Sequence, residues 1–406
     1  MRKVWLTCIS LLLAIAANAS EPQWLVDARA REGKLGRQRQ LESPDGLLRA
    51  RVPAKLAAPI TLADGDYAVN FDIGATSPME CLVRDDSADL AGFLLEVEKP
   101  TFELIASVQG KVETRGVERI DAGAIGANPY LAIEWIYRAN PGAAPVFGGV
   151  KQLVADKHGH AIYCVHIDLG YRETFRKAAH ALVESLEFGE APEKPSYAEV
   201  AVVSTNGMRI GVATNTLVRD AEGNTQSEQR TSMLVPAGPE TLQSSDGIHI
   251  YWMRPDATLI RSLYVEASNG KLESQLELQL GDDGAWHVEG KFKGKPLSAT
   301  WPGTETPSTW LEEALALRKR LGEENAEGAS ISLMQWIASA DPTKLSETKT
   351  TIGKAVGASG VAAHQSGAGL EMDAVLDKSS GMPISITVPV GPSSITVERV
   401  FVDGNL

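Results

Sequence analysis

The chain is predicted to be an α+β protein of two domains, and three features of the sequence lead to this prediction. Its 406 residues exceed the ~250–300 residues that one hydrophobic core usually supports. A break rich in proline and glutamate at residues 189–196 separates mixed helix and strand patterns from patterns typical of strands alone. Apolar residues make up 43% of the chain, which indicates globular domains rather than disorder. We therefore expect an antiparallel sheet with helices on one face in residues 41–188, and a large antiparallel β half-barrel with one main helix in residues 197–406.

Residues 1–19 are predicted to be a signal peptide. Arg2 and Lys3 form a basic start, residues 4–16 are almost uncharged, and Ala17-Asn18-Ala19 has the small-x-small pattern of a cleavage site near Ala19. The apolar run is shorter than the ~20 residues that span a bilayer, and a membrane anchor is the alternative. We expect a periplasmic or secreted protein without a transmembrane segment in its mature chain, which would begin with a polar lead-in at residues 20–40.

Charge and cysteine content narrow the functions further. The formal net charge is −13, and it becomes −15 when Arg2 and Lys3 leave with the signal peptide. Such a surface repels phosphate backbones, which argues against nucleic-acid binding, although the charge also serves solubility.

Cys8 lies in the predicted signal peptide, and only Cys81 and Cys164 remain in the mature chain. In an oxidising compartment this pair predicts one disulfide, and two separately buried thiols are the alternative.

The first domain alternates strand and helix patterns. A helix is expected over residues 85–98, capped by Asp86 or Ser87 and ended by Pro100. A second helix is expected over residues 171–186, with Phe175 and Leu182 on its apolar stripe. Alternating apolar residues predict strands at residues 47–52, 67–73, 79–83, 112–120, 130–138, 151–156 and 161–169.

This order of elements, with a long hairpin and a final helix, resembles the PsbP/Mog1/DcrB-like fold over residues 47–188. The pattern that carries the resemblance is Phe175…Leu182…Ser185-Leu186-Glu187-Phe188 in the last helix. Proteins of that fold are mostly non-catalytic binders or assembly factors, so the resemblance implies binding rather than catalysis.

The second domain is dominated by amphipathic strands. In residues 272–280, Leu276 and Leu278 alternate with charged and polar residues, which is typical of a sheet with one buried face. One helix is expected at residues 309–321, where Thr309 and Glu312 form a capping box. Residues 355–369, rich in Gly, Ala and Ser, are expected to be a mobile loop. Further strands are expected at residues 199–204, 208–220, 286–292, 332–338, 343–353, 370–376, 383–388 and 393–402.

A large sheet around one helix resembles the LolA/LolB-like half-barrels over residues 197–402, including the hairpin Asp377…Gly381-Met382-Pro383. The resemblance implies a concave face that holds an apolar ligand or a partner segment. We therefore predict that aromatic side chains of this domain line a ligand site, with filling of the core as the alternative. The candidates are Trp252, Trp286, Trp301 and Trp336.

Catalytic and metal-binding motifs are weak or missing. His160 and His166 could share one face of a strand with Cys164, but alternate residues on a strand stand roughly 7 Å apart and suit one metal ion poorly. No metal site and no cofactor are predicted. Neither a Gly-x-Ser-x-Gly elbow nor a His-Glu-x-x-His helix occurs.

The predicted function is therefore that of an exported, non-catalytic envelope protein. Its β-rich second domain would bind a hydrophobic, lipid-like ligand or another envelope protein. The alternatives are a secreted hydrolase or transferase with a site at the domain interface, and a purely structural interaction module.

Overall fold

A computed structural model describes residues 22–58, 60–63, 66–85, 89–142, 144–189, 194–238 and 240–406. In these residues the protein is mostly β-structure with four helices, arranged as the two-part architecture that the sequence predicts. The predicted signal peptide and the predicted helix caps Asp86 and Ser87 lie outside the described residues. None of the described helices is long and apolar enough to cross a membrane.

Two small antiparallel sheets build the first half of the chain. The larger sheet has the order β3-β5-β6-β10-β9-β8-β7, with β4 beside β5, and the smaller has the order β1-β2-β11. The larger comprises β3 (Leu56–Ala57), β4 (Thr61–Ala63), β5 (Asp66–Asp72), β6 (Met79–Arg84), β7 (Lys111–Ile125), β8 (Asn128–Asn140), β9 (Val146–Lys157) and β10 (His160–Ile167). The smaller comprises β1 (Gln38–Glu42), β2 (Leu48–Pro53) and β11 (Glu187–Phe188).

The helices α3 (Leu90–Gln109) and α4 (Arg172–Ser185) cover opposite faces of the larger sheet, not one face as expected. On β10, Ile162 belongs to the core cluster around α4, whereas Tyr163 packs against Phe93 of α3 with ring centroids 5.6 Å apart. The physical reason is that β8, β9 and β10 carry apolar side chains at consecutive positions. A sheet that is apolar on both faces must be covered on both.

Helix α3 continues past Pro100, which was expected to end it. A proline inside a helix removes one hydrogen bond and costs about 3 kcal/mol. Phe102 and Ile105, beyond the proline, are buried against the sheet, and burying two such side chains offsets that cost. Tertiary packing therefore overrides the local stop signal.

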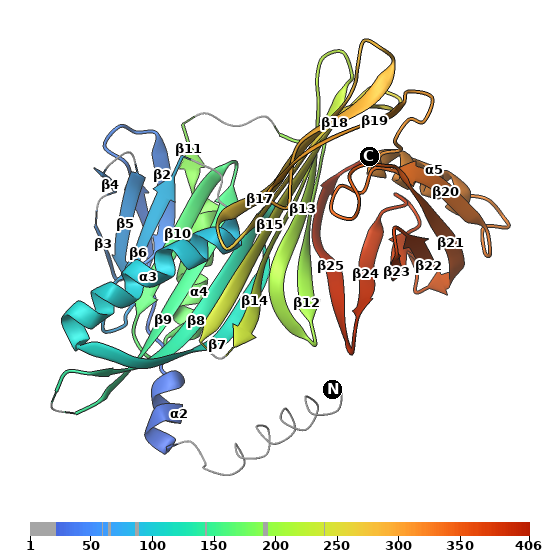
Figure 1. Cartoon of the computed structure of the whole chain (residues 1–406). Helices are drawn as coiled ribbons and strands as arrows, with labels where there is room; N and C mark the ends of the chain where they lie inside the picture. The colour runs from blue at the N-terminus through green and yellow to red at the C-terminus, as the bar shows by residue number, and fades with distance from the viewer. Residues whose placement is uncertain are drawn as a thin grey trace, which may run out of the picture.

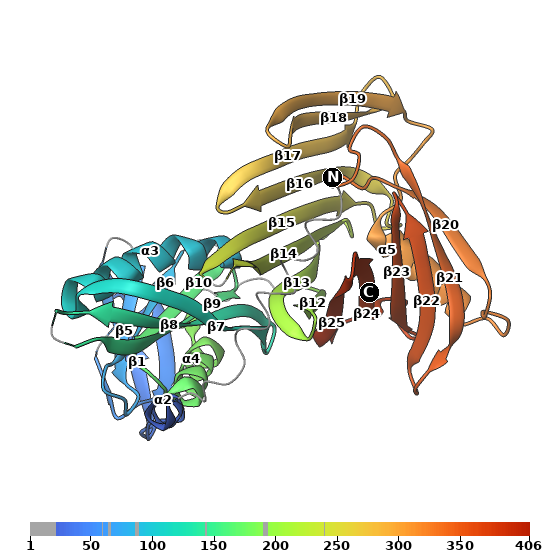
Figure 2. The ribbon, with the colours of Figure 1, turned by 60° about the horizontal axis from the view of Figure 1, so that its bottom comes forward.

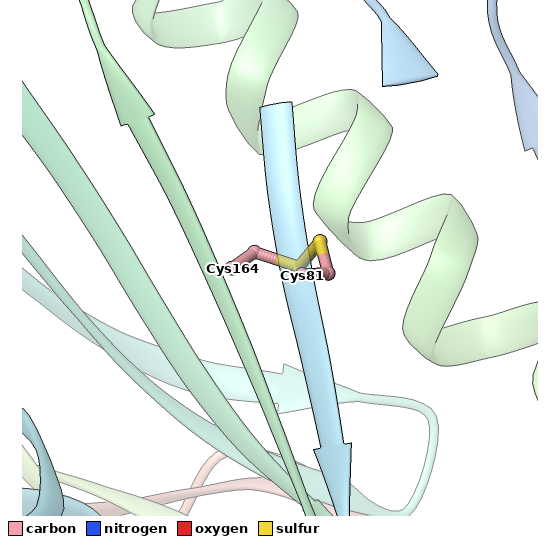
Figure 3. The surroundings of a disulfide bond; sticks show 2 residues. All are labelled: Cys81 and Cys164. Atoms are coloured by element: carbon pink, nitrogen blue, oxygen red, sulfur yellow. A yellow bond between two sulfur atoms is a disulfide. The ribbon is translucent and has the colours of Figure 1, made fainter. Parts of the chain in front are cut away.

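The predicted disulfide is confirmed. Cys81 on β6 and Cys164 on β10 lie directly opposite each other in the antiparallel register and form the bond next to α4 (Figure 3). Both residues are buried in the core cluster that contains the apolar stripe of α4. A buried disulfide is consistent with a protein of an oxidising, extracytoplasmic compartment.

The second half forms one antiparallel sheet of 14 strands that does not close. Its first strand pairs with its last, β12 with β25, in the middle of the sheet, so the edges are β19 and β20. The sheet curves into a half-barrel, with α5 (Trp310–Leu321) between its two walls (Figures 1 and 2). The strands are β12 (Tyr197–Thr205), β13 (Met208–Arg219), β14 (Thr225–Gly238), β15 (Thr241–Met253), β16 (Leu259–Ser268), β17 (Lys271–Leu280), β18 (Ala285–Phe292), β19 (Lys295–Pro302), β20 (Ser330–Gln335), β21 (Ser346–Val356), β22 (Gly360–Gly367), β23 (Leu370–Asp377), β24 (Pro383–Val390) and β25 (Ser393–Gly404).

The expectation of a mobile loop at residues 355–369 is wrong, because β22 occupies most of this segment. Val361 and Ala363 are buried against Leu317 and Leu321 of α5. Small side chains on β22 let the helix approach the sheet closely, and burial there outweighs the poor strand propensity of glycine and alanine.

The two halves share a core. Val212 of β13 and Leu234 of β14 belong to the same buried cluster as Leu131 and Trp135 of the first sheet. Asp246 of β15 accepts hydrogen bonds from the backbone N–H groups of residues 91 and 92, at 3.3 and 3.0 Å, and so caps α3 from the other half of the chain.

The polar lead-in is also attached to the first half. It contains the short helix α2 (Gln23–Arg29). After it, the carboxylate of Glu32 accepts hydrogen bonds from the backbone N–H groups of Glu173 and Thr174, at 3.1 and 2.8 Å. Glu32 thereby caps α4 at its N-terminus.

Candidate ligand-binding site

A cavity of about 360 Å³ lies inside the half-barrel, where α5 faces the inner sides of β12–β14 and β23–β25. A volume of this size is in the range of pockets for small ligands, which span roughly 300–1,000 Å³. The cavity is lined by one side of α5 and by strands of both walls of the half-barrel.

Helix α5 is held in place by hydrogen bonds from both walls. The hydroxyl oxygen of Thr309 accepts from the backbone N–H of Glu312 at 3.1 Å, which confirms the predicted cap. On one wall, the indole N–H of Trp310 donates to Ser227 of β14 at 2.9 Å. On the other wall, Glu313 accepts from three side chains: Gln335 at 2.9 Å, Thr350 at 2.9 Å and Gln365 at 2.8 Å.

The turn between β23 and β24 packs directly on α5. Gly381 has a φ of +76°, and a Cβ atom there would lie 2.2 Å from the carbonyl oxygen of Ala314. Only glycine fits both the left-handed backbone and this close approach. The turn therefore sets the distance between α5 and β24, and with it the width of the cavity.

One end of the cavity is polar. Glu199 accepts a hydrogen bond from the hydroxyl of Tyr197 at 2.6 Å, and Arg399 approaches the same carboxylate at 4.0 Å. Arg399 also donates to Asp377 at 2.9 Å. The side-chain amide nitrogen of Asn215 is buried beside Glu199 and lowers the pKa of that carboxyl, although no hydrogen bond of standard geometry joins the two groups. A donor and a charged pair therefore converge at this end without being fully satisfied by one another.

Burial raises the pKa of Glu199 above its usual value, while the Tyr197 hydroxyl and Arg399 act in the opposite direction. Burial and the nearby Glu199 carboxylate also raise the pKa of Tyr197. The tyrosine therefore stays a hydrogen-bond donor to Glu199 throughout the physiological range.

The remainder of the lining is largely apolar. Apolar side chains are contributed by α5 and by strands from both walls, and polar side chains such as Gln229, Arg230 and Glu313 also line the cavity. The apolar side chains are Ala201, Ala213, Leu317, Leu376, Met382, Ile384, Ile386 and Val397.

The four tryptophans that the sequence predicts to line a ligand site lie outside this cavity. Trp286 and Trp301 are directly opposite each other on β18 and β19, and both are buried in a core cluster with Trp336. Trp252 lies under the guanidinium of Arg261, 3.9 Å from its ring centroid. Of the aromatic residues, Trp310 lines the cavity. The sequence offered one signal for the polar end: Glu199 is a lone charge in the apolar strand Ala198–Val203.

A second polar group lies on the concave floor, where His249 contacts Ser262 at 2.8 Å and Tyr251 at 2.9 Å. The Ser262 hydroxyl donates to the carbonyl of Ile250 at 3.0 Å, so the imidazole must donate to Ser262 and accept from Tyr251. A nucleophilic serine needs the reverse arrangement, with its proton directed at the imidazole. Ser262 is also fully buried, so this trio is structural.

A larger cavity of about 640 Å³ lies between the two halves of the chain, where an enzymatic site could sit. Two of its carboxylates have structural roles. Asp246 caps α3 and also accepts from Ser232, and Glu228 pairs with Arg230. The cavity is also lined by His158, and burial lowers the pKa of this histidine. Among the lining residues that the structure describes, no hydroxyl is hydrogen-bonded to that histidine.

The two histidines considered as metal ligands do not converge. His160 lies 3.2 Å from Asp85 and stacks on Phe188, with ring centroids 3.8 Å apart. His166 is buried between the rings of Tyr171 and Phe175. Within the described ranges, no group of three His, Cys, Asp or Glu side chains is placed to hold a metal ion.

No family model matches the chain, and no curated protein matches it. Two solved structures are distantly similar. A beta-barrel-like protein of domain of unknown function DUF1849 from Brucella abortus is 13% identical, with 52% of this chain and 97% of that chain covered and a TM-score of 0.39. A DUF1089 family protein from Pseudomonas aeruginosa is 13% identical, with 48% and 90% covered and a TM-score of 0.25. The resemblances to PsbP/Mog1/DcrB-like and LolA/LolB-like proteins stay predictions, and the chain is assigned to no family.

Proposed function

We propose that this is an exported protein that holds an amphipathic, lipid-like ligand in the cavity beside α5. The single observation that carries the proposal is that the cavity combines a largely apolar lining with the polar group around Glu199 and Arg399. An apolar tail would lie against Ile384, Ile386 and Val397, and removing that tail from water supplies most of the binding free energy.

The polar end would select the head group. The buried amide of Asn215, which makes no hydrogen bond of standard geometry, offers a donor, and Arg399 offers a positive charge already shared between two carboxylates. Because Glu199 and Asp377 share that charge, the polar end presents both donors and acceptors to a head group.

The direct test is a fluorescence titration with a dansyl-labelled fatty acid and a variant that fills the cavity. Ala213 lines the cavity, and Ala213→Phe would occupy about the volume of several methylene groups there. We expect saturable binding by the wild-type protein and at least a tenfold loss of affinity in the variant.

The matched control is Ala221→Phe, which places the same side chain on an exposed turn between β13 and β14. It should bind the probe like the wild-type protein. Equal affinity in all three proteins would place the ligand elsewhere and refute the proposed site.

An enzyme with a site between the halves is the alternative function, and the larger volume of the interdomain cavity favours it. Against it stand the structural roles of Asp246 and Glu228 described above. Turnover of a chromogenic ester or glycoside by the purified protein, lost on Asp156→Asn but retained in Ala213→Phe, would support this alternative.

A further inference from the structure

A third cavity, of about 470 Å³, lies on the first sheet between α4 and strands β7–β9. Its floor includes Glu134 of β8 and Lys151 of β9, which are directly opposite each other in the sheet. Arg172 and Arg176, one turn apart on α4, form a wall, and Arg119 of β7 forms the other. This cavity is separate from the ligand site proposed above.

The second half of the chain also contributes to this cavity. Arg209 of β13 lines it and donates to the carbonyl of Ala122 on β7 at 3.3 Å. Its guanidinium lies 3.6 Å from Asp121. The cavity is therefore completed only when both halves are packed together.

Positive charge in the lining exceeds negative charge. Each of the three carboxylates has its own arginine: Glu134 has Arg172 at 2.5 Å, Glu173 has Arg176 at 2.6 Å, and Asp121 has Arg209. Arg119 and Lys151 form no ion pair with a lining carboxylate, although Glu134 acts electrostatically on Lys151 and Glu173 on Arg119. Glu118, beyond the lining, is shared by Arg29 and Arg172 at 3.5 and 3.7 Å.

Lys151 is the more informative of the two remaining cations because its residue is 2% exposed. Its ammonium donates to the backbone carbonyl of Asp168. The Asp168 carboxylate is engaged by the backbone N–H groups of Thr76 and Leu169, at 3.2 and 2.8 Å. Burial lowers the pKa of Lys151 to about 8, so the amine is still protonated at neutral pH. A buried ammonium with spare donors favours an anionic partner.

We infer that this cavity binds a compact oxyanion, a phosphate group, beside Arg119 and Lys151. Glu134 lies between these two residues on the sheet, and its carboxylate is neutralised by Arg172. The lining holds five cations and three carboxylates, and this excess of two positive charges matches a phosphate, which carries about −1.5 to −2 charges at pH 7. Guanidinium groups on three sides supply the planar pairs of donors that phosphate oxygens accept. The phosphate can be free, part of a soluble metabolite, or the head group of a lipid.

Isothermal titration calorimetry of the full chain with inorganic phosphate tests this inference. Arg119 is exposed, so Arg119→Gln should leave the fold intact. We expect saturable binding that weakens with added salt, and about a tenfold loss of affinity in Arg119→Gln and in Arg209→Gln. The matched control is Arg219→Gln, at the other end of the same strand as Arg209 and roughly 33 Å away at the usual strand rise.

Two further arms distinguish the source of the phosphate. Competition by vesicles of phosphatidylglycerol in phosphatidylcholine would point to a lipid head group, and competition by glycerol phosphate without an effect of vesicles would point to a soluble ligand. Either result supports the site. Absence of phosphate binding by the wild-type protein, or equal binding by Arg119→Gln and Arg219→Gln, would overturn it, whatever the fatty-acid titration shows.

Discussion

Glu199 illustrates how one side chain changes the chemistry of a cavity. Its strand alternates, so that Tyr197, Glu199 and Ala201 face inward while Val202 faces the first half of the chain. Its burial next to Arg399 creates a polar end in a mostly apolar space. The tryptophans could not be assigned from the sequence in this way, because a large aromatic side chain fills a core as readily as it lines a site.

The disulfide gives a prediction at the scale of residues. Cys81 and Cys164 are separated by 83 residues, and removing such a crosslink costs typically 2–5 kcal/mol. Replacing both with Ala should lower the midpoint of urea unfolding, and reduction of the wild-type protein should lower it similarly. Reductant should not change the midpoint of the double variant. A wild-type midpoint that is insensitive to reductant would contradict this prediction.

At the scale of elements, local sequence predicts what depends on local interactions. Helix α5 is predictable because its cap, its charged ends and its apolar stripe agree. Strand β22 is not, since burial against α5 decides its conformation. The pairing of β12 with β25 joins segments almost 200 residues apart in the chain, and no local pattern encodes it. The cavity depends on that pairing, which is why its lining could not be listed from the sequence.

Helix α5 provides a matched pair of variants. Glu313→Ala would leave three side-chain donors without their acceptor and should cost about 2 kcal/mol of the free energy of unfolding. Glu312→Ala, the adjacent residue in the same helical turn, removes the same charge without those contacts and should cost much less. Urea unfolding of both variants measures the difference. Equal losses would show that Glu313 does not hold α5 to its wall.

At the scale of the whole molecule, the two halves act as one packed unit. The shared core cluster and the cap that Asp246 provides for α3 both cross the boundary between them. The predicted spacer at residues 189–196 therefore joins two halves that are in contact, so the cavity beside α5 and the cavity beside α4 belong to one body. Contacts of this kind are not encoded in either half alone.

The cap also predicts a pH dependence. Burial raises the pKa of Asp246 to about 6, above its usual value of 3.8, so the folded chain binds this proton more tightly than the unfolded chain. Its contribution to the free energy of unfolding is therefore greatest below pH 4 and falls as the pH rises to about 6. The Asp246→Asn variant should not show this fall. The free energy of unfolding of the wild type minus that of the variant should therefore be larger at pH 4 than at pH 7. A difference that does not vary with pH would contradict the prediction.

Loss of the capping carboxylate has a separate cost. Asp246→Ala should lower the free energy of unfolding by about 1 kcal/mol at neutral pH, as for other helix caps. Asp282→Ala, at an exposed turn between β17 and β18, is the control and should be almost neutral. Hydrogen exchange at the first turn of α3 should rise in the first variant only. Unchanged hydrogen exchange at the first turn of α3 would show that this helix does not need the Asp246 carboxylate as a cap.

The most direct test of the proposed ligand site beside α5 is photo-crosslinking with a fatty acid that carries a diazirine at the end of its chain. Peptide mass spectrometry should find the label in α5 and in residues 382–386, which line the apolar part of the cavity. The label should disappear in Ala213→Phe and persist in Ala221→Phe. Labelling that is spread over the surface, or that is concentrated at Trp286 and Trp301 and insensitive to Ala213→Phe, would contradict the proposal.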